Sequence, residues 1–558
     1  MANRKLQIVN ITDYLIFANV KRKKYLLEKV LVTGYAAEGK SLAKIDGKVI
    51  FIAGAVPGDV VDVFVSTNKK DWGEGSATRF HVLSAEREQP FCQHFGICGG
   101  CKWQMLPYQK QLEYKQQEVA QNFRRIGKIE LPDMLPIVGA DATKYYRNKL
   151  EFTFSNKRYL SREEIESMPA MGAPNTSKEE DLPKPSRGEA SPNPSKGGAL
   201  VSAGGSVFQN NEQSTQATQQ KSMNSQGLQS PPLGGGGAFP LGGRGALGFH
   251  VPRIFDKIIE IQECFLMDDV NNIIRNNIRD FARENNYSYY DIKQHTGWLR
   301  NIMIRYCSTG ELMVNIVLGF DDEKERNRLL DFVLSKVPSV TTLLYTINPK
   351  WNDTIYDLTP QVYSGKGYVM EQLEDFKFKI GPKSFFQTNT KQAEKLYSIT
   401  RDFAGLTGTE IVYDLYCGTG SIGIFVSKLA KKIIGVEVIA EAIEDAKQNA
   451  ALNNITHAEF FTGDVIKICD DGFFAQHGKP DVVITDPPRA GMHEKLVIKL
   501  LEMAAPKIVY VSCNTATQAR DLALLSEKYM VEKIQPVDMF PHTHHIECVV
   551  LLRLKEQP

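Results

Sequence analysis

A glycine-rich loop is the first feature of this 558-residue chain whose residue types and spacing can serve chemistry. The segment EIVYDLYCGTGSIGIF places Gly418, Gly420 and Gly423 between a predicted strand and a predicted helix, where missing side chains let backbone and ligand approach closely. Glu437 ends the next predicted strand, KKIIGVEV, a position from which a carboxylate binds ribose hydroxyls. The loop and Glu437 together predict a nucleotide-type ligand, but the spacing alone fits NAD, FAD and S-adenosylmethionine equally.

Two further carboxylates favour S-adenosylmethionine among these ligands. Asp414 lies at the strand end just before the glycine loop, where a carboxylate can meet the cationic amino-acid end of that cofactor. Asp486 stands in DVVITDPPRAG, before two prolines that fix the backbone at the carboxyl edge of the predicted sheet. Such an Asp-Pro-Pro corner resembles motifs of methyltransferases that act on nucleic-acid bases. A stiff turn that merely ends a strand is the structural alternative.

A cysteine and a glutamate near the C-terminus can carry a methyl-transfer mechanism of a particular kind. Cys513 of VYVSCNTATQARDL follows a predicted strand, and a thiolate there can add to carbon 6 of a uracil and make carbon 5 nucleophilic. A base must then remove the proton of carbon 5. Glu547 of HHIECVVLL is the candidate base, since burial among apolar residues raises a carboxyl pKa. An inert buried cysteine is the alternative for Cys513.

Two groups of side chains are of residue types that can bind a metal. Cys92, Cys98 and Cys101 in PFCQHFGICGGCKWQ have the spacing C-x5-C-x2-C, which permits zinc, completed by His94 or a distant cysteine, or an iron–sulfur cluster. The C-terminal histidines are interpreted as part of a substrate loop, with metal ligation as the alternative; they are His542, His544 and His545.

The elements that must position these residues follow from hydrophobic periodicity. From about Ile380 onward, predicted strands such as EIVYDLY, KIIGVEV, DVVITD and KIVYVS alternate with helices, which predicts an α/β fold with a doubly wound, largely parallel sheet. Residues 25–85 have short alternating apolar runs separated by turns, which predicts a small OB-like β-barrel. The sequence of this region resembles the RNA-binding barrel called TRAM, and a structural β-module without a ligand is the alternative.

Composition and charge limit the class of protein. The chain is 42% apolar, carries a net charge of +2 and has no apolar run of 18 residues, so no membrane span is expected. Residues 1–130 hold 20 Lys and Arg against 13 Asp and Glu, which predicts that the partner-facing end of the protein is the N-terminal one. Nine cysteines are too few for a disulfide scaffold in a chain of this length, so a cytoplasmic location is expected.

Four motifs in fixed order, DLYCGTGSIGI, TDPPRAGMH, VYVSCN and HHIECVVLL, closely resemble those of the RNA uracil-5 methyltransferases of the RlmD, TrmA and RlmCD type. The resemblance covers nearly the whole chain and implies a Rossmann-like, S-adenosylmethionine-dependent methyltransferase domain. It also implies that Cys513 is the nucleophile and Glu547 the base. Ser421 stands where relatives often have Asn. The residues implied to contact or flank the cofactor are Gln387, Tyr416, Ser421, Glu437, Asp464 and Asp486.

The same resemblance implies a [4Fe-4S] cluster in a structural or RNA-positioning role. Its ligands are Cys92, Cys98 and Cys101, with Cys264 of EIQEC as the fourth. Cluster-bearing relatives act mainly on large-subunit ribosomal RNA, so 23S rRNA is the expected substrate, with tRNA as the alternative. No feature of the sequence indicates an obligate protein partner, and a monomer is expected.

The expected division has six consecutive segments, two of which form one central domain. They are an N-terminal extension over 1–24, the barrel over 25–85, a central α+β domain over 86–157 and 248–379, a disordered low-complexity insertion over 158–247 that splits it, and the methyltransferase domain over 380–558. Two other functions remain open. Methylation of an exocyclic amine needs neither Cys513 nor Glu547, and a non-catalytic RNA-binding assembly factor needs no chemistry at all. An NAD-dependent oxidoreductase is supported by the glycine loop alone.

Overall fold

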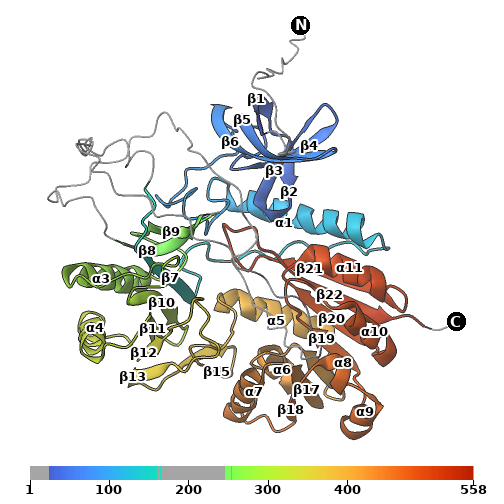
Figure 1. The fold of residues 1–558 in the computed structure, drawn as a ribbon. Coiled ribbons are helices and arrows are strands. Elements are labelled where there is room, and N and C mark those ends of the chain that lie inside the picture. Colours follow the sequence, from blue (N-terminus) through green and yellow to red (C-terminus); the bar gives the residue numbers. More distant parts are fainter. Residues whose placement is uncertain (1–23, 161–163, 165–244, 253, 557–558) are drawn as a thin grey trace, which may run out of the picture. The chain divides into compact units, whose positions relative to one another are not determined.

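The computed structural model of this chain describes residues 24–160, 164, 245–252 and 254–556 (Figure 1). Nearly all of the expected extension over 1–24 and most of the expected insertion over 158–247 lie outside the described residues. The chain divides into two compact units, Met1–Tyr159 with Gln219–Pro558, and Leu160–Thr218, and every element named below belongs to the first. None of the helices within the described ranges combines the length and the apolar character that crossing a bilayer requires.

A six-stranded sheet forms from the N-terminal residues. Its order is β1-β5-β6-β4-β3-β2, and neighbours are antiparallel except β4 and β6. Val61, Val63 and Val65 are fully buried, as the period-2 alternation predicts. Strands β1 and β2 lie at opposite ends of this order, whereas a closed barrel requires the two end strands to pair. The OB-like barrel and the TRAM domain therefore stay predictions. The strands are β1 (Tyr25–Leu31), β2 (Gly34–Ala36), β3 (Lys40–Ile45), β4 (Lys48–Ala53), β5 (Val60–Asn68) and β6 (Trp72–Val82), with a 3-10 turn η1 (Ala37–Gly39).

A seven-stranded sheet of order β13-β12-β11-β10-β7-β8-β9 follows in the chain. Strands β7 and β8 pair antiparallel, with Thr153 opposite Gly248, although more than 90 residues separate them. The apolar residues of α3 and α4 bury one face of this sheet. The elements are β7 (Lys149–Ser155), β8 (Ala246–Val251), β9 (Ile254–Glu260), α3 (Val270–Glu284), β10 (Leu299–Tyr306), β11 (Leu312–Leu318), α4 (Glu323–Lys336), β12 (Thr342–Ile347) and β13 (Gln361–Gly365).

The other face of this sheet contributes Met303, Met313 and Leu344 to a second core. That core also contains Val369 and Phe378 from the hairpin of β14 (Val369–Leu373) and β15 (Phe376–Ile380), together with apolar residues of the C-terminal sheet. The hairpin therefore packs with the C-terminal region that begins, in the predicted division, only at residue 380.

The C-terminal sheet has the order β18-β17-β16-β19-β20-β22-β21. Its first five strands are parallel, while β22 runs antiparallel to both β20 and β21. This sheet and its helices confirm the predicted α/β class. The strands are β16 (Ile411–Leu415), β17 (Lys432–Glu437), β18 (Ala458–Thr462), β19 (Val482–Thr485), β20 (Lys507–Ser512), β21 (Tyr529–Val537) and β22 (Glu547–Leu554).

Helices bury both faces of this sheet, which explains why its strands are apolar on both sides. Residues of α5, α6 and α7 share one core with the sheet, and residues of α10 and α11 share the other. The helices and turns are α5 (Thr390–Ala404), α6 (Ser421–Val426), η3 (Ser427–Leu429), α7 (Ala440–Leu452), α8 (Val465–Ile468), α9 (Asp471–His477), α10 (Glu494–Met503) and α11 (Thr515–Leu525).

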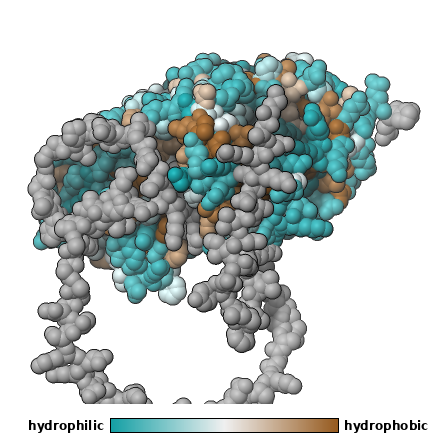
Figure 2. Space-filling model, turned by 90° about the horizontal axis from the view of Figure 1, so that it is seen from above, coloured by the Kyte–Doolittle hydropathy of each residue, from teal (hydrophilic) through white to brown (hydrophobic). Residues whose placement is uncertain are grey.

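An early helix also packs on the C-terminal sheet. Val119 of α1 (Tyr108–Asn122) and Phe123 of the π-helical turn η2 (Phe123–Gly127) are buried in the same core as α11. Large apolar side chains that stay exposed come from many elements and include Phe255, Phe320 and Trp351. On the face seen in Figure 2, hydrophobic areas are broken up by hydrophilic ones.

Candidate active site

The candidate residues gather at the edge of the C-terminal sheet where its parallel strands end. Connections leave β16 toward β17 on one side, while β19 pairs with β16 on the other, so a topological switch point lies beside β16. Strand β22 is antiparallel, with Cys548 opposite Ser512, and it therefore starts at this same edge. The residues at the edge are Asp464 after β18, Glu437 at the end of β17, Asp414 in β16, Asp486 after β19, Cys513 after β20 and Glu547 at the start of β22.

Glu437 and the glycine loop form one hydrogen-bonded unit. Oε2 of Glu437 accepts from the backbone N–H of Gly418 at 3.3 Å, and Oε1 accepts from Val438 at 2.8 Å. A Cβ atom added at Gly418 would have no neighbour within 4 Å, whereas one added at Gly420 would lie 3.0 Å from both Ala446 and Phe460. The loop is therefore closely packed at Gly420 and open at Gly418, which leaves room for a ligand there.

Asp414 presents a buried oxygen to this region. Its side chain is only 1% exposed, and Oδ2 accepts from the backbone N–H of Gly423 at 2.8 Å. Oδ1 has no hydrogen-bond partner within the described ranges. Burial raises the pKa of Asp414 to about 7, with Asp486 and Glu437 adding to the shift. A cationic ligand group is the kind of partner that such an oxygen lacks.

Cys513, Glu547 and Asp486 act on one another electrostatically. Burial raises the pKa of the Cys513 thiol, and the carboxylates of Glu547 and Asp486 raise it further. Burial, followed by Asp486, raises the pKa of Glu547 well above its ordinary value, and burial raises the pKa of Asp486 to about 7. One thiol and two carboxyl groups of high proton affinity thus share the edge between β19, β20 and β22.

Arg489 is a site residue that the sequence reasoning missed. Its guanidinium opposes the upward pKa shifts of both Cys513 and Glu547. Its backbone carbonyl accepts from Nδ2 of Asn514 at 3.0 Å and from Oγ1 of Thr517 at 3.3 Å. Asn514 also caps α11 by accepting from Ala516 at 3.1 Å. Asn514, which directly follows Cys513, therefore holds the Asp-Pro-Pro-Arg turn. The position of Arg489 directly after the Asp-Pro-Pro corner was the sequence signal that could have identified it.

The remaining predicted cofactor residues lie on two sides of the loop. Ser421 begins α6, and its Oγ is 3.0 Å from Oη of Tyr397 on α5. Asp464 caps α8. Burial raises the pKa of Tyr416, and the carboxylate of Asp464 adds to this shift. Gln387 is buried before α5, and its backbone carbonyl accepts from Asn148 at 3.1 Å. In the described part of the chain, Gln387 is therefore hydrogen-bonded to the residue that precedes β7, and not to the carboxylates of the sheet edge.

The histidine loop before β22 is tied to residues that precede α1 and lie within it. The backbone N–H groups of Lys102 and Trp103 both donate to the carbonyl of His542, at 2.7 and 3.1 Å. Nε2 of Gln111 lies 3.1 Å from Nδ1 of His542. Further along, Nδ1 of His545 lies 3.1 Å from Nη2 of Arg489. The loop thus connects the segment that follows the cysteine triplet with the candidate catalytic edge.

The four cysteines predicted as ligands lie near one another. Burial raises the pKa of Cys98 to about 12, and Cys264 and Cys92 add to the shift. Burial also raises the pKa of Cys101, and Cys98, Cys264 and Cys92 add to that shift. Cys264 is 8% exposed and packs in one core with the partly buried Cys98 and Cys101. Tertiary structure thus brings Cys264 to the triplet across more than 160 residues.

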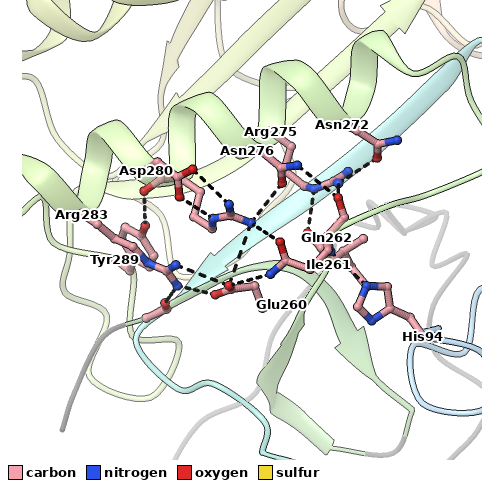
Figure 3. A network of polar contacts seen from close by, with 12 residues as sticks. His94, Glu260, Ile261, Gln262, Asn272, Arg275, Asn276, Asp280, Arg283 and Tyr289 are labelled. Carbon is pink, nitrogen blue, oxygen red and sulfur yellow. Dashed lines mark hydrogen bonds and ion pairs between the residues drawn. The ribbon is translucent and has the colours of Figure 1, made fainter. Parts of the chain in front are cut away.

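A polar network holds the loop that carries Cys264 (Figure 3). Arg275 of α3 donates to the carbonyls of Ile261 and Gln262, at 3.1 and 2.8 Å. The backbone N–H of Gln262 donates to Nε2 of His94 at 3.0 Å. Oδ1 of Asn272 accepts from the N–H of Cys264 at 2.8 Å. Helix α3 therefore fixes the Cys264 loop against the segment that contains the cysteine triplet.

Metal ligation by a compact set of side chains is not seen in the described residues. There, no three His, Cys, Asp or Glu side chains are arranged closely enough to hold a single metal ion. This holds for His542, His544 and His545 and for the four cysteines. The four cysteines are free thiols.

Comparison with known proteins gives a consistent picture. Residues 360–555 match the family model described as tRNA (Uracil-5-)-methyltransferase. An uncharacterized RNA methyltransferase of Bacteroides thetaiotaomicron is 47% identical over 93% of this chain and 100% of its own length, and one of Porphyromonas gingivalis is 44% identical over 93% and 98%. The solved structure of Pyrococcus abyssi tRNA (uracil-54, C5)-methyltransferase in complex with S-adenosyl-L-homocysteine is 24% identical, with a TM-score of 0.62 over 94% of this chain and 100% of that one. That structure supports the fold, and the sequence matches support the assignment: this chain belongs to the RNA uracil-5 methyltransferase family.

Proposed function

We propose that this protein transfers a methyl group from S-adenosylmethionine to carbon 5 of a uridine in RNA, with Cys513 as nucleophile and Glu547 as base. One observation carries the proposal. Cys513, Glu547 and Asp486 meet at the sheet edge that also holds the glycine loop, and they interact electrostatically. A nucleophile and a base of high proton affinity beside a nucleotide-type loop are the groups that this reaction requires.

The residues present suit S-adenosylmethionine. Space is open beside Gly418, and Oδ1 of Asp414 lacks a partner in the described structure, so a loop that admits adenosine adjoins a carboxylate that can meet a cation. S-adenosylmethionine, when bound, supplies an electrophilic methyl group. The residues proposed to contact or flank it are Gln387, Tyr416, Ser421, Glu437, Asp464 and Asp486.

The chain's own residues have two steps to perform. The Cys513 thiolate forms a bond to carbon 6, and the electrons of the double bond between carbons 5 and 6 make carbon 5 nucleophilic toward the methyl group. The donor's sulfur keeps the electron pair of the bond that breaks. The Glu547 carboxylate then accepts the proton of carbon 5. The electrons of that C–H bond restore the double bond as the sulfur–carbon 6 bond breaks and the thiolate leaves.

Replacement of the nucleophile tests this proposal. We expect Cys513→Ala to abolish formation of 5-methyluridine on deproteinised RNA, measured by nucleoside analysis, while S-adenosylhomocysteine still binds. Cys469→Ala is the matched control, because this buried thiol interacts with Lys499 and Asp470 rather than with the site. RNA that contains 5-fluorouracil adds a second readout, since its carbon 5 has no proton to lose and a Cys513 adduct persists. Methylation of an exocyclic amine would form no such adduct, and 5-methyluridine made by Cys513→Ala would refute the role of this thiol.

We propose 23S ribosomal RNA as the substrate. The support is the four-cysteine arrangement, which the sequence resemblance associates with enzymes of ribosomal RNA, whereas the family description and the Pyrococcus abyssi structure both name tRNA. Mapping 5-methyluridine in both RNAs from a strain that lacks the gene decides between them. Loss of the base from 23S rRNA alone supports the proposal, and loss from tRNA alone overturns it.

We also propose that Cys92, Cys98, Cys101 and Cys264 hold a [4Fe-4S] cluster. Four thiols form a donor set that suits such a cluster. Support comes from the packing of Cys264 in one core with Cys98 and Cys101, and from the electrostatic influence of Cys92 on Cys98 and Cys101. A cluster holds its thiolates farther apart than a single ion does, which is compatible with the absence of a one-ion site in the described residues. Anaerobic purification followed by iron, sulfide and zinc analysis tests this assignment, and zinc without sulfide would contradict it.

A further inference from the structure

The backbone of Arg489 is held by hydrogen bonds, whereas its side chain is exposed. Its backbone is held by Asn514 and Thr517, whose side chains donate to its carbonyl at 3.0 and 3.3 Å. Both donors lie at the start of α11, immediately after Cys513. The backbone of Arg489 is therefore tied to the cysteine, whereas its long, exposed side chain has many rotamers available unless a second contact restrains it.

His545 supplies that second contact. Its Nδ1 lies 3.1 Å from Nη2 of Arg489. A guanidinium can only donate hydrogen bonds, so Nδ1 must accept and the single proton of the neutral ring must sit on Nε2. Burial lowers the pKa of His545 to about 2, and His544, Arg489, Arg147 and Lys115 all act in the same direction. The lowered pKa keeps the imidazole neutral near pH 7, so Nδ1 is free to accept the hydrogen bond.

A neutral acceptor has a specific consequence for the charge of Arg489. In the described residues, the ionisable groups that act on Cys513 are Glu547, Asp486 and Arg489. The two carboxyl groups oppose the thiolate when they are ionised, whereas the Arg489 guanidinium favours it. A carboxylate in place of His545 would neutralise the guanidinium. A side chain without an acceptor would release it toward solvent or toward Glu547. An imidazole holds it and leaves its charge available to the thiol.

We propose that His545 is a positioning residue that holds the Arg489 guanidinium beside Cys513 and so promotes formation of the thiolate before RNA binds. This inference rests on the proposed role of Cys513 as nucleophile. It assigns to His545 neither metal ligation nor contact with the reacting atoms. It also accounts for the position of Arg489 directly after the Asp-Pro-Pro corner, where one turn carries both Asp486 and the cation.

The test measures the thiol directly, without RNA or cofactor. The rate of Cys513 alkylation by iodoacetamide is followed against pH by mass spectrometry of the peptide that contains it. Because a nearby opposite charge shifts a pKa by about one unit or more, we expect His545→Leu to move the midpoint up by about one pH unit. Below the midpoint this is about a tenfold slower alkylation. Arg489→Leu should move the midpoint at least as far, and the double variant no farther than Arg489→Leu alone.

Conservative variants separate positioning from general damage. In His545→Asn the side-chain carbonyl can replace Nδ1 as acceptor, so its midpoint should stay near that of the unchanged protein. His545→Gln removes the acceptor from that place and should resemble His545→Leu, which gives a second measurement if the leucine variant folds poorly. An unchanged midpoint in both His545→Leu and His545→Gln overturns the proposal, as does an unchanged midpoint in Arg489→Leu.

Failure of this inference is distinguishable from failure of the proposed function. If Cys513 were not the nucleophile, the 5-fluorouracil adduct would be missing while the alkylation midpoints could still shift. If His545 did not position Arg489, the adduct would form and the midpoints would coincide.

Discussion

At the scale of single residues, the site concentrates acidic groups that favour their protonated forms. Burial raises the pKa values of Asp414, Asp486 and Glu547, and each of the three lies at the same edge of the C-terminal sheet. Among the described residues, the guanidinium of Arg489 opposes the upward pKa shifts of Cys513 and Glu547. The pKa values of Cys513 and Glu547 are therefore set by burial first, by neighbouring carboxyl groups second and by the Arg489 guanidinium third.

Asp414 provides a pH test of this environment. Its pKa is about 7 in the folded protein and about 4 in an unfolded chain, so between these pH values only the folded state holds the proton. The resulting stabilisation is fully present below about pH 4 and is lost as the pH rises through 7. Denaturation of the ligand-free protein should show stability falling between pH 5 and 8 by about 3 kcal/mol more than in Asp414→Asn. Equal falls would contradict a protonated Asp414.

At the scale of elements, strand ends and helix starts do most of the positioning. Asn514 caps α11 and restrains Arg489, and Asp464 caps α8 beside the predicted cofactor residues. The glycine loop between β16 and α6 contacts α7 through Gly420, while Gly418 faces open space. Two glycines of one loop thus have different physical reasons for lacking a side chain.

Alanine at these two glycines should separate folding from cofactor binding. Both have positive φ, 76° at Gly420 and 52° at Gly418, so each change costs about 1–2 kcal/mol of backbone strain. Gly420→Ala also forces a Cβ atom against Ala446 and Phe460, and we expect the larger loss of thermal stability there. Gly418→Ala should lose more affinity for S-adenosylhomocysteine, measured by calorimetry, than its loss of stability explains. The reverse order would place the cofactor elsewhere.

At the scale of the whole chain, the loop that leads to Glu547 depends on distant segments. Nζ of Lys115 on α1 is 2.7 Å from Oδ1 of Asp538, and both side chains are completely buried. Oη of Tyr108 donates to Oδ2 of the same aspartate at 2.9 Å. Together with the bonds to His542, these contacts anchor the loop on residues more than 400 positions earlier. The catalytic edge is therefore completed by the N-terminal half of the chain.

Lys115→Met tests this anchorage. The change leaves Asp538 buried without its cation, and breaking a buried pair in this way costs about 3–5 kcal/mol. Urea denaturation should detect the loss, and methyl transfer should fall because the loop that precedes Glu547 is released. Lys110→Ala on the same helix is the control, since its ion pairs with Glu86 and Glu113 are exposed and contribute little. Similar effects of the two changes would show that the buried pair does not anchor the loop.

Features that depend on neighbours along the chain could be predicted from the sequence. The alternation of apolar runs predicted the α/β class, and the glycine loop with Asp414, Asp486 and Cys513 could be placed at strand ends, because periodicity and turn residues are local properties. Glu547 could be named as a candidate base from its apolar neighbours in the sequence. The pairing of Cys264 with the cysteine triplet came from the family resemblance, since spacing alone does not relate Cys264 to the triplet.

The three-dimensional fold was needed to establish which strand ends are adjacent, and therefore which side chains act on one another. The antiparallel entry of β22 brings Glu547 to Cys513, the turn after β19 brings Arg489 to His545, and α1 packs on a sheet that begins almost 300 residues later. Such contacts form because apolar faces are buried together and buried charges find partners across the fold. No local pattern records which distant partner a segment will meet.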